Sequence, residues 1–297
     1  MAESLSLDPG VFKGHGLGND YLVFRQGGGW EVTPESVRRV CHRWRGVGGD
    51  GIVALLSPVQ EPFRLRMFNP DGTEFERSGN GLRILGAYLF GEGLVEQRVP
   101  FRIEVGGDEV GMEILGWESG GVLQVRVEMG KASFEPQAVG LVPASLEPDG
   151  ALVGPGGERL DLVPVSMGNP HCVVLRDGLD GKDLEVLGPF LAAHRAFANG
   201  TNVQLARPEG EGRVSILIWE RGVGRTSSSG TSACAAAAAC VRRGLLTPGT
   251  IEVVMEGGSF LVTVTEEMEV RLEGPVQPLM SGTISGELLA DLHGLSS

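Results

Sequence analysis

Two Ser-Gly turns carry the residue types in this chain that are best suited to chemistry. Ser78-Gly79 and Ser229-Gly230 each stand directly before a helix-like stretch. The first N–H groups of a helix lack internal partners and carry partial positive charge. Two such helix ends that converge can bind a carboxylate, and each turn adds a hydroxyl beside it. A single serine at a helix start is more often a simple N-cap, so the repetition is what favours a reactive site.

The two turns belong to a longer internal repeat. Gly18-Asn19 recurs as Gly168-Asn169 at an offset of 150 (168 − 18), and Ser78-Gly79 recurs as Ser229-Gly230 at an offset of 151 (229 − 78). Each Gly-Asn pair leads into a β-branched and aromatic run, and each Ser-Gly pair leads into a helix. Both dipeptides are common in turns, but two landmarks in the same order at offsets that differ by one residue predict two copies of one α/β unit.

Further polar residues lie beside glycine or proline at predicted strand-to-turn junctions. An isolated asparagine in a turn usually serves the local backbone. Several asparagines together with a Glu-Arg pair favour instead a binding site in which neutral and charged side chains hold a small zwitterion. These polar residues are Asn19, Asn69, Asp71, Asn169, His171, Asn202, Glu220 and Arg221.

The elements that must position these residues recur in both halves. Apolar and β-branched runs predict strands over residues 63–68, 101–105, 214–219 and 251–256, and a hairpin over 260–272. Helices are predicted over residues 34–45, 81–90, 189–198 and 232–243. We therefore expect a mixed α+β fold with two pseudo-symmetric domains, each an antiparallel sheet wrapped around a central helix.

The predicted division of the chain follows from this repeat. The N-terminal domain is expected over residues 1–130 and the C-terminal domain over residues 131–277. A Gly/Pro-rich stretch near residues 130–160 surrounds the junction. A return of the C-terminal tail, residues 278–297, to the first domain is left open.

The bulk composition indicates a soluble protein with a small-molecule partner. The chain has 297 residues, a formal net charge of −13 and 41% hydrophobic residues. The negative charge argues against nucleic acid and anionic membranes, and no apolar run approaches the roughly 20 residues of a membrane span. Four cysteines without a C-x-x-C pair predict reduced, mostly buried thiols and no zinc site. We therefore expect a cytoplasmic protein without a bound metal.

At this point the chain resembles a known family, the diaminopimelate epimerases, within the wider group that includes proline racemase. The matching stretches are KGHGLGND at 13–20, GVGGDG at 46–51, FNPDG at 68–72, GNG at 79–81, GNPH at 168–171, TNV at 201–203 and ERGVG at 220–224. They span almost the whole chain in the order of the family. Such coverage is specific for the fold.

The resemblance implies a two-domain epimerase that works without a cofactor. In this family the active site lies in the interdomain cleft, and LL-diaminopimelate becomes meso-diaminopimelate in lysine or cell-wall precursor synthesis. One group removes the α-proton while a second protonates the opposite face. Carried over by position, the residues that would hold the distal end of the substrate are Asn19, Asn69, Asn169, Asn202, Glu220 and Arg221. Those that would bind the reacting carboxylate through helix-end amides are Gly79, Asn80, Gly230 and Thr231.

The two catalytic positions, Ser78 and Ser229, depart from the family, whose members carry a cysteine at each turn. A thiol has a reference pKa of about 8.5, which a helix N-terminus lowers, whereas the pKa of an alcohol lies closer to the value of roughly 15.7 for water. Even a gap of about 5 units corresponds to about 7 kcal/mol, or roughly 10⁵ in rate, for a serine that acts unaided as the base. His171 and Glu220 are therefore candidates for rewired catalytic bases, and a serine can still serve as the acid.

Two further departures lie near the second turn, where Arg225 replaces a glutamate and Ser232 replaces a glycine of the family. Both can alter which substrate is held. The open alternatives are a deliberate replacement of the reactive cysteines, a natural epimerase with rewired bases, a racemase of another amino acid, and a catalytically silent amino-acid-binding protein. The oligomeric state is also open, and a homodimer is one alternative.

Overall fold

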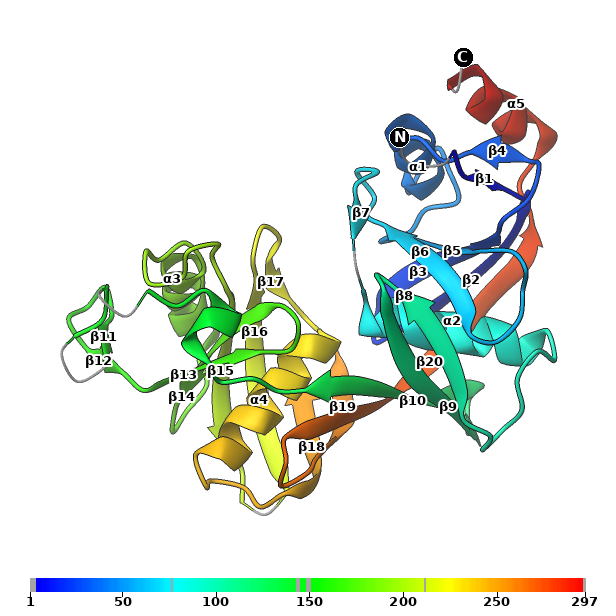
Figure 1. Cartoon of the computed structure of the whole chain (residues 1–297). Helices are drawn as coiled ribbons and strands as arrows, with labels where there is room; N and C mark the ends of the chain where they lie inside the picture. Colours follow the sequence, from blue (N-terminus) through cyan, green and yellow to red (C-terminus); the bar gives the residue numbers. More distant parts are fainter. Residues whose placement is uncertain (1–3, 76, 143–144, 148–150, 211, 296–297) are drawn as a thin grey trace. The chain divides into compact units, whose positions relative to one another are not determined.

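The computed structural model describes residues 4–75, 77–142, 145–147, 151–210 and 212–295, which form two compact units (Figure 1). Unit 1 contains the chain up to Val127 and from Gly274 onwards, and unit 2 contains Glu128–Glu273. The chain passes from one unit to the other within strands β10 (Val122–Lys131) and β20 (Glu269–Thr283). Residues 143–144 and 148–150 of the expected junction, and 296–297 of the tail, lie outside the described part.

Unit 1 surrounds one helix with the strands of a sheet. In sheet order the strands are β10, β9 (Asp108–Glu118), β8 (Phe101–Val105), β6 (Phe63–Phe68), β5 (Ile52–Leu55), β3 (Asn19–Arg25), β2 (Gly10–Gly16) and β20. Helix α2 (Gly79–Gly91) packs against β2, β3, β5 and β9. Most of its residues are buried, as expected for a helix that is apolar on every side.

Shorter elements complete unit 1. Strand β1 (Ser6–Leu7) pairs with β4 (Trp30–Glu31), and β7 (Glu74–Phe75) pairs with β6. Helix α5 (Gly286–Leu295), formed by the C-terminal segment, packs against β4 and α1 (Pro34–Cys41). Its residue Leu292 is fully buried in one core cluster with Leu7 and Trp30. The two ends of the chain therefore contribute to one hydrophobic core.

Unit 2 has the same arrangement around helix α4 (Gly230–Arg242). Its strands in sheet order are β13 (Leu162–Ser166), β14 (Pro170–Leu175), β15 (Asn202–Pro208), β16 (Arg213–Glu220), β18 (Gly249–Met255), β19 (Gly258–Val264) and β20, with β17 (Gly224–Thr226) beside β16. Residues 232–241 of α4 are all buried against these strands, and their small side chains allow the close packing. Helix α3 (Gly181–Ala192) packs on β15 and β16. Three short elements precede β13, namely the 3-10 helix η1 (Pro136–Val139) and the strands β11 (Leu152–Val153) and β12 (Arg159–Leu160).

The structure confirms the internal repeat. The order β2-β3-α1-β5-β6-β7-α2-β8-β9 in unit 1 corresponds to β13-β14-α3-β15-β16-β17-α4-β18-β19 in unit 2. The direction of each strand pair also corresponds. At the Gly-Asn landmarks the backbone is the same, since Gly18 has φ 90° and Gly168 has φ 91°. This left-handed conformation favours glycine in the β2–β3 hairpin of unit 1 and in the β13–β14 hairpin of unit 2.

The mixed α+β class and the central helices are as expected, with three differences in detail. Each sheet also contains parallel pairs, such as β3–β5 and β14–β15, because a helix connects the two strands of each pair. The first helix ends at Cys41 rather than at residue 45. The helix predicted over residues 189–198 was wrong: α3 begins at Gly181, because the Asp180 side chain caps it, and Pro189 lies inside it.

No helix in the described part of the chain is long and apolar enough to cross a membrane. The same residues contain no group of three or more histidine, cysteine, aspartate or glutamate side chains arranged to hold a metal ion.

Candidate active site

The first Ser-Gly turn forms the N-terminus of α2 in unit 1. Ser78 is the N-cap residue in an extended conformation, and its Oγ accepts a hydrogen bond from Gly81 N at 3.1 Å. Its own backbone N–H points to the Met67 sulfur at 3.3 Å. Because Oγ serves as the acceptor for the helix, the hydroxyl hydrogen remains available for donation to a ligand.

Asn80, in the first turn of α2, is held by both ends of its amide. Its Nδ2 donates to the backbone oxygen and to Oδ1 of Asn19 at 2.7 and 2.8 Å. Its Oδ1 accepts from the guanidinium of Arg83 at 2.9 Å. Arg83 is fully buried and also donates to Gly79 O at 3.2 Å, so a positive charge lies one turn below the helix end. Gly16 of β2 must be glycine, because a Cβ there would collide with Asn80 Oδ1.

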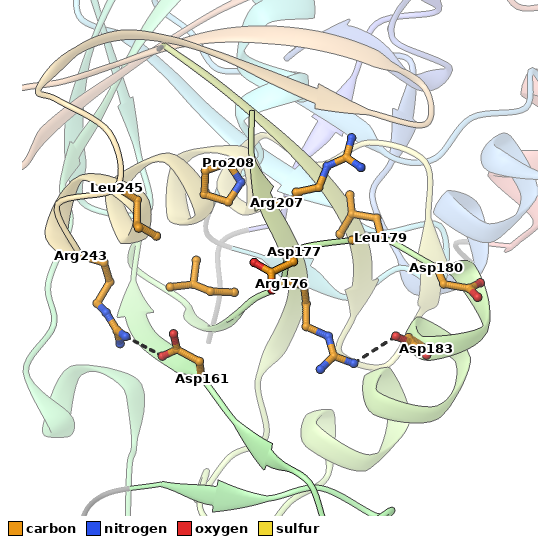
Figure 2. Close-up of a pocket in the computed structure, with 12 residues that line it drawn as sticks. Asp161, Arg176, Asp177, Leu179, Asp180, Asp183, Arg207, Pro208, Arg243 and Leu245 are labelled. Atoms are coloured by element: carbon orange, nitrogen blue, oxygen red, sulfur yellow. Dashed lines mark hydrogen bonds and ion pairs between the residues drawn. The ribbon is translucent and has the colours of Figure 1, made fainter. Parts of the chain in front are cut away.

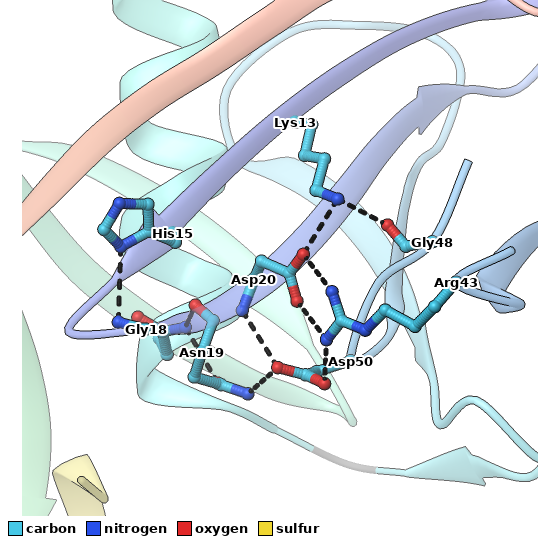
Figure 3. A network of polar contacts seen from close by, with 9 residues as sticks. Lys13, His15, Gly18, Asn19, Asp20, Arg43, Gly48 and Asp50 are labelled. Atoms are coloured by element: carbon cyan, nitrogen blue, oxygen red, sulfur yellow. Dashed lines mark hydrogen bonds and ion pairs between the residues drawn. The ribbon is translucent and has the colours of Figure 1, made fainter. Parts of the chain in front are cut away.

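Asn19 is fixed in turn by a charged network (Figure 3). Its Nδ2 donates to Asp50 Oδ2 at 2.9 Å, and the Arg43 guanidinium bridges Asp50 and Asp20 at 2.6 to 2.7 Å. Lys13 forms an ion pair with Asp20 at 2.9 Å. Burial alone would raise the pKa of Asp20, but the hydrogen bonds from Arg43 and Lys13 outweigh it and lower the pKa to about 2. Asp20 is therefore ionised at neutral pH and anchors this network.

Asn69 lies in the tight turn between β6 and β7. Its Nδ2 donates to Thr73 Oγ1 at 3.0 Å, and its backbone N–H donates to Thr73 O at 2.9 Å. Asp71 accepts from the backbone N–H and the hydroxyl of Thr73 at 2.8 and 2.6 Å. No hydrogen bond among the described residues joins this turn to Asn19 or Asn80.

The second Ser-Gly turn forms the N-terminus of α4 in unit 2, where the serine has a different partner. Ser229 is again the N-cap residue, but its side chain makes no hydrogen bond to the helix. Its hydroxyl instead interacts with the carboxylate of Glu220, at the end of β16. Burial raises the pKa of Glu220 above its usual range, and the interaction with Ser229 opposes this rise. The pair matches the arrangement of a hydroxyl nucleophile or base activated by a carboxylate.

Asn202 and Arg221 are brought together beside this turn. Asn202 Oδ1 accepts from Arg221 N at 3.0 Å, and Asn202 Nδ2 donates to Pro170 O at 3.1 Å. The Arg221 guanidinium contacts the backbone oxygen of Asn199. The strand register places Asn202 opposite His171, so the start of β15 adjoins the start of β14.

His171 is fully buried, and both of its ring nitrogens are hydrogen-bonded. Nε2 lies 2.9 Å from Asn169 Oδ1, and Nδ1 lies 3.1 Å from Gln204 Nε2. Burial lowers the pKa of His171 to about 3, so the ring is neutral at physiological pH. Gln204 was not predicted as a site residue, and its only sequence signal is a polar side chain inside the apolar strand β15.

Arg225 stands apart from these contacts. Its guanidinium pairs with Glu256 at 2.6 Å and with Glu185 at 3.3 Å. The hydrogen bonds to these carboxylates raise the pKa of Arg225 above its usual range. Arg225 is therefore accommodated by ion pairs within unit 2.

The four cysteines, Cys41, Cys172, Cys234 and Cys240, are free in the structure, and all four are buried as expected. Burial raises the pKa of Cys41, Cys172 and Cys240 to about 12. Thiolates are the reactive form of cysteine, so these three thiols are inert near neutral pH.

A cavity of unit 2 lies elsewhere (Figure 2). It has a volume of about 990 Å³ and is lined by charged residues that include Arg176, Arg207 and Arg243. Arg243 pairs with Asp161 at 2.7 Å, as the dashed line in Figure 2 shows. The cavity adjoins the C-terminal ends of β14, β15 and α4, whereas the predicted residues lie at the N-terminal ends of the same elements. The pocket and the predicted site are therefore separate.

Most of the chain matches a family of known proteins. The family model described as diaminopimelate epimerase matches residues 11–135 and 163–278, and so includes both Ser-Gly turns and their partners. The chain belongs to the diaminopimelate epimerase family. It is 38% identical over 281 residues to diaminopimelate epimerase 2 of Nostoc sp., covering 94% of this chain and 96% of the relative. It is 34% identical to diaminopimelate epimerase of Desulfitobacterium hafniense, covering 94% and 99%.

The fold of the family is also seen in solved structures. A probable proline racemase from Agrobacterium radiobacter, solved with bound carbonate, superposes with a TM-score of 0.66 at 17% identity, covering 97% of this chain and 98% of that one. Identity this low shows the fold alone. Membership of the diaminopimelate epimerase family makes the chain an isomerase of the amino-acid epimerase class.

Proposed function

We propose that the protein epimerises LL-diaminopimelate to meso-diaminopimelate in the cytoplasm by cofactor-independent two-base proton transfer. The names of the relatives support the substrate, and the two equivalent helix ends support the reaction. The observation that carries the proposal is the Glu220 carboxylate at the end of β16, which interacts with Ser229 at the start of α4 and so gives one of the two alcohols a general base.

The roles of the two serines follow from their different partners. Ser229 Oγ takes the α-proton of the substrate while its own hydrogen passes to the Glu220 carboxylate. Ser78 donates its hydroxyl hydrogen to the opposite face of the resulting carbanion. Ser78 then regains a proton from solvent, and Glu220 releases its proton to solvent. The N-terminus of α2 and the buried Arg83 charge stabilise the transient Ser78 alkoxide. Protons and electrons balance, because one C–H bond breaks and one forms.

Glu220 offsets only part of the handicap of an alcohol. A hydrogen bond to a charged group contributes about 1.5–3 kcal/mol, against the roughly 7 kcal/mol estimated for a thiol-to-alcohol change. We therefore propose a slow epimerase whose rate rises when cysteine replaces serine. If the serine form is as fast as the cysteine form, a stronger base than Glu220 must activate the serine.

The substrate contacts of the proposed site divide into two groups. The backbone N–H groups of Gly79, Asn80, Gly230 and Thr231 at the starts of α2 and α4 bind the reacting carboxylate. The distal end is bound by Asn69, Asn169, Asn202 and Arg221. Asn19 and His171 act indirectly, because Asn19 holds Asn80 and His171 holds Asn169. His171 is thereby reassigned from a catalytic base to a positioning residue.

Chiral separation of the products tests the proposal directly. The protein is incubated with LL-diaminopimelate, and the meso isomer is measured over time for this chain, for Ser229→Ala and for Ser78→Ala. We expect slow formation of the meso isomer by this chain and none by either alanine variant. Equal product with and without the alanine replacements would remove both serines from the mechanism.

A second candidate function is amino-acid binding without turnover, because both reactive positions are alcohols. In that case LL-diaminopimelate binds but no meso isomer forms, even in the Ser78→Cys, Ser229→Cys double variant. A racemase of a different amino acid is distinguished by a panel of free amino acids followed by circular dichroism. Turnover of another member of the panel in preference to diaminopimelate would identify it.

A further inference from the structure

A buried chain of hydrogen bonds in unit 2 ends at Asn169. Gln204 Nε2 donates to Ser232 Oγ at 2.9 Å, and the same nitrogen lies 3.1 Å from His171 Nδ1. His171 Nε2 lies 2.9 Å from Asn169 Oδ1. Ser232, Gln204 and His171 are fully buried, whereas Asn169 is only half-buried. These hydrogen bonds therefore link Ser232, in the first turn of α4, to Asn169, which a ligand can reach.

The position of one hydrogen on His171 decides what Asn169 presents to a ligand. The ring is neutral, so only one of its nitrogens carries hydrogen. When Nδ1 accepts from Gln204, the hydrogen is on Nε2, and Asn169 Oδ1 accepts it. Asn169 then turns its NH₂ group to the ligand. The alternative has the hydrogen on Nδ1, with the oxygen and nitrogen of both the Gln204 and Asn169 amides exchanged. Asn169 would then present its oxygen to the ligand.

The hydrogen-bond partners of the Gln204 amide favour the first arrangement, in which the hydrogen is on His171 Nε2. In that setting Gln204 Oε1 lacks a hydrogen-bond partner among the described residues. In the reversed setting the Gln204 NH₂ group would stand there, and its donors would be unpaired. A buried donor without a partner is rarer than an under-satisfied carbonyl oxygen. Moreover, Asn169 Nδ2 has no acceptor among the described residues, so it can donate to a ligand.

We propose that Gln204 is a positioning residue for substrate selection, because it locks His171 in the Nε2–H tautomer and so holds the Asn169 amide with its nitrogen towards the ligand. Asn169 then binds an oxygen acceptor, such as a carboxylate, and disfavours an ammonium group. This inference rests on the proposed function in one respect, namely that Asn169 contacts the substrate. Ser232 has a part in it as well, since its Oγ accepts the second hydrogen of the Gln204 amide.

The tautomer can be observed without any ligand or turnover. Long-range ¹H–¹⁵N correlation spectra of the histidine-labelled protein distinguish Nε2–H, Nδ1–H and imidazolium forms, and the His171→Gln variant assigns the resonance among the five histidines. We expect His171 as the Nε2–H tautomer from mildly acidic to mildly basic pH. An Nδ1–H or imidazolium form near neutral pH would overturn the proposal.

Two variants of Gln204 test the link to binding. Gln204→Glu places an acceptor beside Nδ1 and should move the His171 hydrogen to that nitrogen. Gln204→Met keeps the length of the side chain but donates to neither neighbour, so it should release the tautomer to a mixture. We expect LL-diaminopimelate, titrated calorimetrically, to bind about tenfold more weakly to Gln204→Glu, which corresponds to about 1.4 kcal/mol, with a smaller loss for Gln204→Met.

The outcomes separate this inference from the proposed function. A changed tautomer with unchanged affinity for LL-diaminopimelate would contradict the selection role. An Nε2–H spectrum with graded losses of affinity supports it, even if no meso isomer is ever formed. If Gln204→Glu does not fold, the spectrum of the unaltered chain and the affinity of Gln204→Met still decide the question.

Discussion

The Ser229 hydroxyl interacts with the Glu220 carboxylate, although Ser229 occupies the same place at the start of α4 that Ser78 occupies at the start of α2. Ser78 instead accepts a hydrogen bond from Gly81. The two turns therefore differ in their electrostatic surroundings. Ser229 lies beside a carboxylate that can accept a proton, whereas Ser78 lies at the start of the helix that contains the buried, positively charged Arg83. This asymmetry assigns the base to unit 2 and the acid to unit 1 in the proposed mechanism.

Replacement of Glu220 tests the base. Glu220→Gln should reduce α-proton exchange by about 10²–10⁴, the usual contribution of a general base. The matched control is Glu256→Gln, which removes the same charge from an exposed ion pair with Arg225 in the same unit. Exchange by the control variant should stay close to that of the unaltered chain. An equal loss in both variants would point to net charge rather than to a base.

The pH dependence of exchange follows from the raised pKa of Glu220. The carboxylate accepts a proton only when ionised, so the rate should rise with pH through a midpoint above the ordinary value of about 4.3 for glutamate. The acid limb should disappear in Glu220→Gln. An acid limb at the ordinary histidine value of about 6.5 that persists in that variant would return His171 to the catalytic role.

Asp20 predicts a second pH effect, on stability. Its pKa is depressed to about 2 in the folded chain, so its stabilising contribution is fully present above about pH 4 and is lost as pH falls through about 2. The difference from the ordinary value corresponds to about 2–3 kcal/mol. Asp20→Asn should therefore destabilise the protein near neutral pH, as measured by urea unfolding, and the gap between the two proteins should close in acid. A gap that is independent of pH would rule out the ionic explanation.

Replacement of Arg83 should weaken ligand binding as well as proton transfer. Arg83→Met retains most of the buried volume but leaves Asn80 Oδ1 and Gly79 O without this donor. We expect LL-diaminopimelate to bind on the order of tenfold more weakly, because the orientation of Asn80 and the positive charge below the helix are both lost. Urea unfolding of the same variant measures how much of the change is structural. Unchanged affinity in a folded variant would exclude Arg83 from the site.

The sequence was sufficient for the architecture and for the place of the two turns. Repeated landmarks such as Gly18 and Gly168 reflect a backbone conformation that only glycine adopts easily, so they report the fold directly. The partners of the turns could not be read in this way. Whether Ser229 meets Glu220 or the N–H groups of its own helix depends on how β16, β17 and α4 pack.

Burial was the other property that single residues did not reveal. His171 was predicted as a candidate base because histidine commonly serves so, but complete burial makes it neutral and occupies both nitrogens. Gln204 was missed because a glutamine carries no special signal until its strand is known to be internal. The helix start at Gly181 was missed because Pro189 is a stronger helix-start signal than the Asp180 cap.

Exchange of the α-proton of LL-diaminopimelate in D₂O, followed by proton NMR, tests the central claim most directly. It is measured for this chain, for the Ser78→Cys, Ser229→Cys double variant, and for that variant with Glu220→Gln. We expect slow exchange by this chain and much faster exchange by the double variant, because a thiol is the stronger acid by about 5 pKa units or more. Exchange by neither protein, while both bind the ligand, would contradict the assignment of the two turns as the proton-transfer site.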